Sequence, residues 1–318
     1  MDNNEFDVVV IGGGAAGLSA ALMVGRSLRS VLVVDAGETR NRFADEMHGV
    51  LGNEGTSPAD LVARGRVEVE QYGVQFAAER VAAVAGPADG PVLVTAESGR
   101  RWSARAVIVA TGVGDRLPDV AGLAERWGHS VLHCPYCHGW EVRGRRLGVL
   151  ATSAFGLHQV QMVRQLSDDV VLFLPSDVPL AETDERRLSA RNVRIVRTAV
   201  EEILGEGRDI SGVRLADGSI EQIEAVFTIG TPVLHDGFLD GLGLQRTDGP
   251  WGSFLTVDEF GRTTHPRIWA AGNVVNPMAN VPLAMGNGSF VGAAVNGFLV
   301  TEDFDLASRT VGSMAGRR

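Results

Sequence analysis

Residues 7–35 carry the feature that most restricts the fold, a glycine-rich turn between a strand and a helix. The apolar run DVVVI (7–11) predicts a buried strand, and GGGAAG follows it directly. Residues 15–25 are small and apolar, as in a helix packed close to a sheet, and SVLVV (30–34) predicts a second strand ending at Asp35. This order of elements predicts a βαβ unit of the Rossmann type.

Each glycine of this turn has a separate task. Gly12 permits the tight turn, Gly14 lets the backbone approach a pyrophosphate, and Gly17 lets the helix pack on the strand. The helix N-terminus then faces the phosphates, and Asp35 is placed to accept hydrogen bonds from the adenosine ribose. A turn without a ligand is the alternative, but the complete βαβ context favours a bound dinucleotide, without deciding which one.

A second stretch of the same design begins at Arg146, where LGVLATSAFGLHQVQMVRQLSDDVVLFLP again predicts strand, turn, helix and strand. Any side chain at the second glycine position keeps the backbone away from a pyrophosphate, so we expect a degraded nucleotide site here. Aligning the two turns places Ala151 opposite Gly12, Ser153 opposite Gly14 and Gly156 opposite Gly17.

The residues after this second unit also disfavour NADPH. They read LFLPSDVPL and contain no basic cluster for a 2′-phosphate. Arg186 and Arg187 come later and are interpreted as a solvated helix face. A divergent but functional nicotinamide site is the alternative.

The two units predict an α/β fold with two Rossmann-like domains of the three-layer ββα type, the second inserted into the first. We expect further strands at 92–95 and 106–110, a strand and glycine turn in RIWAAGNV from residue 267, and a small-residue helix at 287–300. The connections are expected at 114–118 and 230–237. The predicted outer domain is 1–114 with 237–318, and the predicted central domain is 115–236.

Composition excludes several classes of partner. The formal net charge of -10 offers no basic footprint for nucleic acid, and an anionic membrane would repel the chain. No apolar run is expected to approach the length of a bilayer span, and MDNNEF lacks the features of a signal peptide. We therefore expect a cytoplasmic protein that binds neither nucleic acid nor membrane.

The segment VLHCPYCHGWE (131–141) contains the only two cysteines, Cys134 and Cys137. Two close cysteines could form a redox dithiol, half of a zinc site or a CxxCH haem-attachment box. Haem attachment would require export. Zinc would require His133 and His138 as further ligands, which is strained within six residues.

Four motifs together resemble the low-molecular-weight thioredoxin reductase family of flavoproteins over nearly the whole chain: GGGAAG, ATG at 110–112, the CxxC, and AAGN at 270–273. The resemblance implies FAD as cofactor, a discontinuous FAD-binding outer domain and a homodimer. It implies a flavin site formed by Gly12, Gly14, Ala15, Ala16, Gly17, Asp35, Ala36, Val81, Ala110, Thr111, Gly112, Gly272, Asn273, Asn280 and Val281. Asn273 stands where the family usually has Asp, which changes the local charge or reflects neutral drift.

In a flavoprotein the CxxC is best explained as a dithiol that exchanges electrons with the flavin. The resemblance implies that Cys134 reacts with substrate and that Cys137 faces the flavin. His138 replaces the family's usual Asp and can take a proton from an incoming thiol near neutral pH. His133 is a second catalytic candidate, whereas we interpret three other histidines as structural: His48, His129 and His158.

The CPYCHG-like motif and the degraded nucleotide turn resemble the dithiol oxidase branch of this family. The resemblance implies an FAD-dependent oxidase that forms a disulfide in a small-molecule, natural-product type dithiol, with O2 as acceptor and H2O2 as product. The alternatives are a thioredoxin reductase-like enzyme fed by NADPH or ferredoxin, and a flavin-binding redox sensor. The identity of the dithiol is not readable from the sequence.

Overall fold

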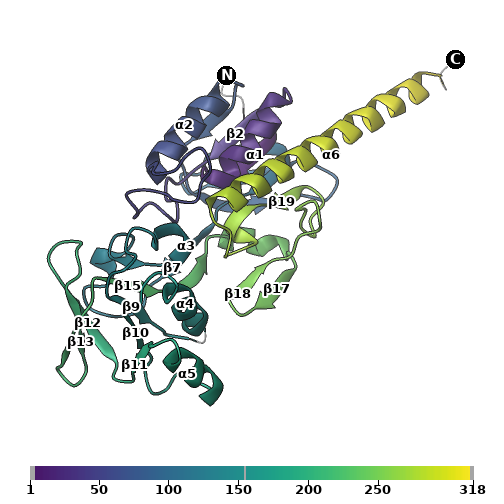
Figure 1. The fold of residues 1–318 in the computed structure, drawn as a ribbon. Helices are drawn as coiled ribbons and strands as arrows, with labels where there is room; N and C mark the ends of the chain where they lie inside the picture. Colours follow the sequence, from purple (N-terminus) through teal and green to yellow (C-terminus); the bar gives the residue numbers. More distant parts are fainter. Residues whose placement is uncertain (1–3, 154, 316–318) are drawn as a thin grey trace. The chain divides into compact units, whose positions relative to one another are not determined.

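The computed structural model describes residues 4–153 and 155–315, with side chains to residue 309. Its internal contacts divide the chain into two compact units (Figure 1). The first comprises Met1–Arg40, Ala59–Gly114 and Pro232–Arg318, and the second comprises Asn41–Pro58 and Asp115–Thr231. The predicted fold class, with one Rossmann-like unit inserted into another, is confirmed. The exact domain boundaries stay predictions, and residues 41–58 belong to the second unit although they lie within the first predicted domain.

The first unit is built on a seven-stranded sheet with the order β3-β2-β1-β6-β5-β4, to which β19 adds by pairing with β6. The start of β6 pairs antiparallel with β5, and its end pairs parallel with β19. β1 runs parallel to both β2 and β6. The strands are β1 (Glu5–Ile11), β2 (Val31–Val34), β3 (Gln75–Ala77), β4 (Val81–Ala85), β5 (Val92–Ala96), β6 (Arg101–Val109) and β19 (Ile268–Ala270).

Alternating side chains of β1 supply both faces of this sheet. Val8 and Val10 belong to the core cluster shared with the helices, whereas Val9 and Ile11 pack with β4 and β5 on the other face. The helices are α1 (Ala15–Arg26), α2 (Pro58–Glu70) and α6 (Val281–Ala315). The unit also contains a hairpin of β17 (Arg246–Gly249) and β18 (Gly252–Leu255), and the short helices η2 (Gly237–Leu242) and η3 (Gly272–Val274).

Helices α1 and α6 lie side by side because glycines let them approach closely (Figure 1). A Cβ at Gly288 would lie 2.0 Å from the carbonyl oxygen of Ala16, and one at Gly292 would lie 2.7 Å from that of Ala20. Both positions therefore require glycine.

The expectation that no apolar run approaches a bilayer span is corrected by α6. Its stretch Val281–Arg309 is long and apolar enough to cross a membrane by length and composition alone. Val291, Val295 and Leu299 of this stretch are fully buried in the cluster that contains α1. About 33% of the apolar window is buried, so one face of α6 packs on α1.

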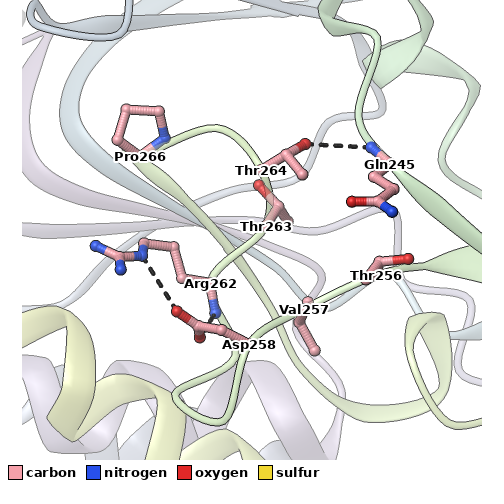
Figure 2. Close-up of a pocket in the computed structure, with 8 residues that line it drawn as sticks. All are labelled: Gln245, Thr256, Val257, Asp258, Arg262, Thr263, Thr264 and Pro266. Carbon is pink, nitrogen blue, oxygen red and sulfur yellow. Dashed lines mark hydrogen bonds and ion pairs between the residues drawn. The ribbon is translucent and has the colours of Figure 1, made fainter.

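A recess of about 530 Å³ follows β18 in the first unit (Figure 2). The Thr264 hydroxyl accepts a hydrogen bond from the main-chain amide of Gln245 at 3.2 Å. Arg262 forms an ion pair with Asp258 at 3.3 Å. None of the predicted site residues lines it. The lining residues are Gln245, Thr256, Val257, Asp258, Arg262, Thr263, Thr264 and Pro266.

The second unit contains a parallel sheet with the order β11-β10-β9-β15-β8 and a separate antiparallel sheet, β12-β13-β14. Buried side chains cover both faces of the parallel sheet, which gives the expected layers. The parallel strands are β8 (Val131–Leu132), β9 (Leu147–Leu150), β10 (Val170–Phe173), β11 (Arg194–Val196) and β15 (Ala225–Thr228). The antiparallel strands are β12 (Val200–Leu204), β13 (Gly212–Leu215) and β14 (Ile220–Gln222). The helices are η1 (Ala124–Arg126), α3 (Pro135–His138), α4 (Phe155–Val163) and α5 (Glu182–Ser189).

Each of the two connections contains a short strand, β7 (Val113–Arg116) and β16 (Thr231–Leu234), and these form a two-stranded sheet.

Candidate active site

The predicted flavin residues gather at one edge of the first sheet. β1, β2, β6 and β19 run parallel, so their carboxyl ends meet there. The glycine-rich turn follows β1, Asp35 and Ala36 follow β2, the ATG follows β6, and Gly272 with Asn273 follows β19. Val81 begins β4, while Asn280 and Val281 stand at the start of α6. The assignment of these residues to a flavin stays a prediction.

The glycine-rich turn has the close approaches expected of a nucleotide cradle. Gly12 has a φ of 106°, and a Cβ there would lie 2.4 Å from the Ala110 carbonyl oxygen. A Cβ at Gly17 would lie 1.9 Å from the Gly12 carbonyl oxygen. A Cβ at Gly14 would meet only Thr39, at 3.8 Å, which leaves this backbone open to a ligand.

Two polar groups at the same edge also suit a dinucleotide. The Gly13 amide donates to Oδ1 of Asp35 at 3.0 Å, which holds the carboxylate on the turn. Oγ1 of Thr111 is buried and has no hydrogen-bond partner among the described residues, so a ligand can supply one. The edge therefore fits a bound dinucleotide such as FAD.

Asn273 has a structural reason to be an amide. Its two Nδ2 hydrogens are shared among three main-chain carbonyl oxygens, those of Asn276 at 3.0 Å, Pro277 at 3.2 Å and Ala279 at 2.9 Å. A carboxylate only accepts hydrogen bonds and cannot replace these donors. Asn280 caps α6, since its Oδ1 accepts from the Leu283 amide at 3.2 Å.

Cys134 and Cys137 form a disulfide in the second unit, with their Cα atoms 5.2 Å apart. Cys134 is the N-cap of α3, and its Sγ accepts a hydrogen bond from the Cys137 amide at 3.2 Å. That donor would stabilise a thiolate on Cys134 after reduction. The pair is thus a disulfide whose first sulfur already accepts a main-chain hydrogen bond.

His138 ends α3 directly after this disulfide. Burial lowers the pKa of the His138 imidazole, the charge of His48 lowers it further, and Glu141 opposes both. The ring is therefore neutral near neutral pH and can accept a proton.

His133 follows β8 and is held from two sides. Its carbonyl oxygen accepts a 2.6 Å hydrogen bond from Nε2 of Gln159, a fully buried residue of α4, and its ring lies edge-on to Trp127 at 6.2 Å. These contacts fix the backbone that leads into Cys134.

The second nucleotide turn repeats a main-chain hydrogen bond of the first turn but carries a side chain where the first turn has glycine. The Ala151 amide donates to Phe173 at 3.0 Å, just as Gly12 donates to Val34 at 2.8 Å. The Ala151 side chain is fully buried, and a Cβ at Gly156 would lie 2.3 Å from its methyl carbon.

Arg186, Arg187 and Arg197 follow this turn in the chain. Arg186 and Arg187 are exposed on α5. Arg197 Nη1, however, donates to the Val178 carbonyl oxygen at 3.4 Å, in the segment after β10. Arg197 directly follows the next strand, β11, so it is distant in sequence from the segment that it contacts.

Comparison with known proteins decides the family. The pyridine nucleotide-disulphide oxidoreductase model matches residues 6–288. The chain belongs to this family. It is 33% identical over 307 residues to thioredoxin reductase sirT of Leptosphaeria maculans, covering 92% of this chain and 93% of that one. It is 35% identical over 303 residues to thioredoxin reductase tcpT of Claviceps purpurea (strain 20.1), covering 91% and 93%. The crystal structure of HlmI superposes with a TM-score of 0.93 at 42% identity and covers 98% of each chain.

This oxidoreductase is therefore a thioredoxin reductase-like flavoprotein. The sequence did not predict two hydrogen bonds in the unit that contains the disulfide. One joins Gln159 to the His133 carbonyl oxygen, and the other joins His48 to Glu54. Neither follows a motif, because the residues approach only in the folded unit.

Of the other histidines interpreted as structural, His129 lies 3.1 Å from both Asp45 and Asp209, and His158 is exposed.

Proposed function

We propose that this flavoprotein is an FAD-dependent dithiol oxidase that forms a disulfide in a small-molecule dithiol of the natural-product type. The observation that carries the proposal is the second nucleotide turn, where the buried Ala151 methyl packs on Gly156 and Ser153 replaces the second glycine. Without a glycine cradle for NADPH, the electrons must come from another donor. A dithiol that reacts at the CxxC is that donor.

The edge formed by Gly12, Gly14, Asp35 and Thr111 would hold the pyrophosphate, ribose and flavin portions of FAD. Bound FAD would take the electron pair of the reduced cysteines, and O2 would regenerate it with formation of H2O2.

The chain's own residues account for the thiol steps. His138 accepts the proton of the first substrate thiol, and the resulting thiolate attacks Sγ of Cys134. The Cys134–Cys137 bond breaks, a mixed disulfide forms, and Cys137 leaves as a thiolate. The second substrate thiol then loses its proton to water and, as a thiolate, displaces Cys134 and closes the product disulfide. The amide of Cys137 stabilises the charge on Cys134 as it leaves.

The proposal is tested by the products formed in air. Purified yellow protein, supplied with a small dithiol such as dithiothreitol, is expected to form one H2O2 for each disulfide, because each product transfers two electrons. Cys137→Ser is expected to abolish this turnover. A variant that still oxidised dithiols at the full rate would remove the CxxC mechanism.

A second candidate function is a thioredoxin reductase-like disulfide reductase. Arg197 favours it, because a base beside the segment after β10 could bind a phosphate. Such an enzyme would be reduced by NADPH, or by ferredoxin if the nicotinamide site is lost. A redox sensor without turnover is the weakest alternative and would show neither reduction nor peroxide.

The proposed cellular setting follows from charge and resemblance. The net charge of -10 disfavours nucleic-acid and anionic membrane partners, and a cytoplasmic location is proposed from the resemblance. A homodimer is proposed from the family resemblance, with exposed apolar side chains of α6 as the contact.

A further inference from the structure

Residues 41–58 form a compact loop that places His48 beside Glu54 in the second unit. A β-bridge joins Met47 to Thr56. The Met47 amide donates to Thr56 at 2.9 Å, and the Gly55 amide donates back to Met47 at 2.9 Å. Met47 is buried, which anchors the bridge. The bridge thereby brings together two side chains that are six residues apart.

Glu54 holds the His48 ring in one orientation. Nδ1 of His48 lies 2.8 Å from Oε1 of Glu54, and the Gly49 amide donates to Oε2 at 2.9 Å. These hydrogen bonds lower the pKa of Glu54, the His48 bond most. A carboxylate only accepts, so Nδ1 of His48 carries a proton.

His138 lies next to this held ring. The two ring centroids are 6.2 Å apart and the planes are perpendicular. Nε2 of His48 lies 3.6 Å from Glu141 and 3.7 Å from Glu46. Three carboxylates therefore lie near the His48 ring, Glu46 and Glu54 from the loop and Glu141 from the segment after α3.

We propose that His48 is a positioning residue that, held by Glu54, keeps the His138 imidazole neutral and able to accept the proton of an incoming thiol. The inference rests on the proposed dithiol oxidation. When it carries charge, the His48 ring disfavours a second positive charge on the neighbouring His138 imidazole. Glu141 then faces the imidazolium that forms.

The thiol step moves one proton and two electron pairs. The thiol proton moves to His138, and the electron pair of the S–H bond forms the new bond to Cys134. The Cys134–Cys137 bond breaks with its electron pair left on Cys137.

The test compares two histidine variants of the FAD-loaded protein. In His48→Asn, the side-chain amide can still donate to Glu54, so the loop keeps its anchor while the ring and its charge are lost. His129→Asn is the matched control, because His129 also lies between two carboxylates of this unit, Asp45 and Asp209.

The first readout is an NMR pH titration of the His138 imidazole in the oxidised protein, without substrate. We expect its midpoint to move to higher pH in His48→Asn and to stay unchanged in His129→Asn. An unchanged midpoint in His48→Asn would overturn the proposal.

The second readout is the rate of anaerobic flavin reduction by dithiothreitol across pH. His48→Asn is expected to be about 3–10-fold slower on the acidic side of the profile and equal to wild type on the alkaline side. A loss of equal size at every pH would assign His48 a structural role and overturn the proposal. Wild-type protein that dithiols do not reduce would overturn the proposed function instead, since the NMR midpoint still decides whether the two histidines are coupled.

Discussion

The side-chain amide of Gln159 donates a 2.6 Å hydrogen bond to the main-chain carbonyl oxygen of His133. This bond ties α4 to the residue that precedes Cys134. Oε1 of Gln159 is buried and has no hydrogen-bond partner among the described residues. Among the described residues, the side chain of Gln159 therefore forms its hydrogen bond through Nε2 and not through Oε1.

Gln159→Glu is expected to destabilise the second unit strongly. The new carboxylate would be buried against a carbonyl oxygen, and an uncompensated buried charge costs about 3–5 kcal/mol of unfolding free energy. Denaturant unfolding at neutral pH measures the loss. His158→Glu, at an exposed position of the same helix, is the control and should change stability by less than about 0.5 kcal/mol. Equal effects of the two variants would contradict the importance of the Gln159 bond.

Asn273→Asp is expected to loosen the 276–279 loop and weaken FAD retention. A carboxylate would face the three carbonyl oxygens that now share the two Nδ2 hydrogens, and repulsion would replace this hydrogen bonding. Protonation of the new carboxyl group restores one donor. The loss of bound flavin and of stability should therefore grow as pH rises through the pKa of that group. Flavin release and thermal unfolding at several pH values test this.

Asn276→Asp is the matched control for that variant. Oδ1 of Asn276 accepts from the Met278 amide at 3.1 Å, and a carboxylate can accept the same bond. Flavin retention should therefore be close to wild type. If both variants released flavin equally, the donor role of Asn273 would be wrong.

Glu302 of α6 is expected to make stability depend on acidic pH. Burial alone would raise the pKa of this carboxyl group, but hydrogen bonds from Arg267 and Arg105 outweigh burial and lower it. Its contribution is therefore complete above the ordinary glutamate pKa of about 4.3 and is lost as pH falls through the lowered folded value. Glu302→Gln should reduce the free energy of unfolding by roughly 1–3 kcal/mol at neutral pH. It should also make the decrease of that free energy at acidic pH smaller. Asp305→Asn, at an exposed position, should leave the profile unchanged.

The exposed apolar face of α6 is expected to mediate a homodimer. Leu283, Phe290 and Phe304 are 51%, 50% and 74% exposed and recur at spacings of whole heptads, which places them along one face of the helix. Phe304→Glu should shift the protein to a monomer in analytical ultracentrifugation, whereas Arg309→Glu should not. A monomeric wild type, or a dimer unaffected by Phe304→Glu, would contradict this surface.

The sequence predicted those parts of the fold that local patterns specify. The first strand, turn and helix appear where expected because apolar periodicity and Gly12 determine them together. The last helix was predicted at 287–300 but extends from Val281 to Ala315. Its glycines disfavour a helix in isolation, and only packing on α1, through Gly288 and Gly292, makes them stabilising.

The site was predictable where a motif carries the chemistry and not where tertiary contacts do. The CxxC and the degraded turn at Ala151 are visible in the sequence. The donors of Asn273, the anchoring of His133 by Gln159 and the approach of His48 to His138 depend on residues distant in the chain. Because no local pattern encodes such contacts, they could not be read in advance.

The most direct test of the account is an anaerobic titration of the purified flavoprotein with two reductants, followed by flavin absorbance. The account predicts that a small dithiol bleaches the flavin, that NADPH does not, and that air restores the colour with formation of H2O2. Rapid bleaching by NADPH would contradict it, because the turn at Ala151 and Ser153 would then still bind a nicotinamide dinucleotide.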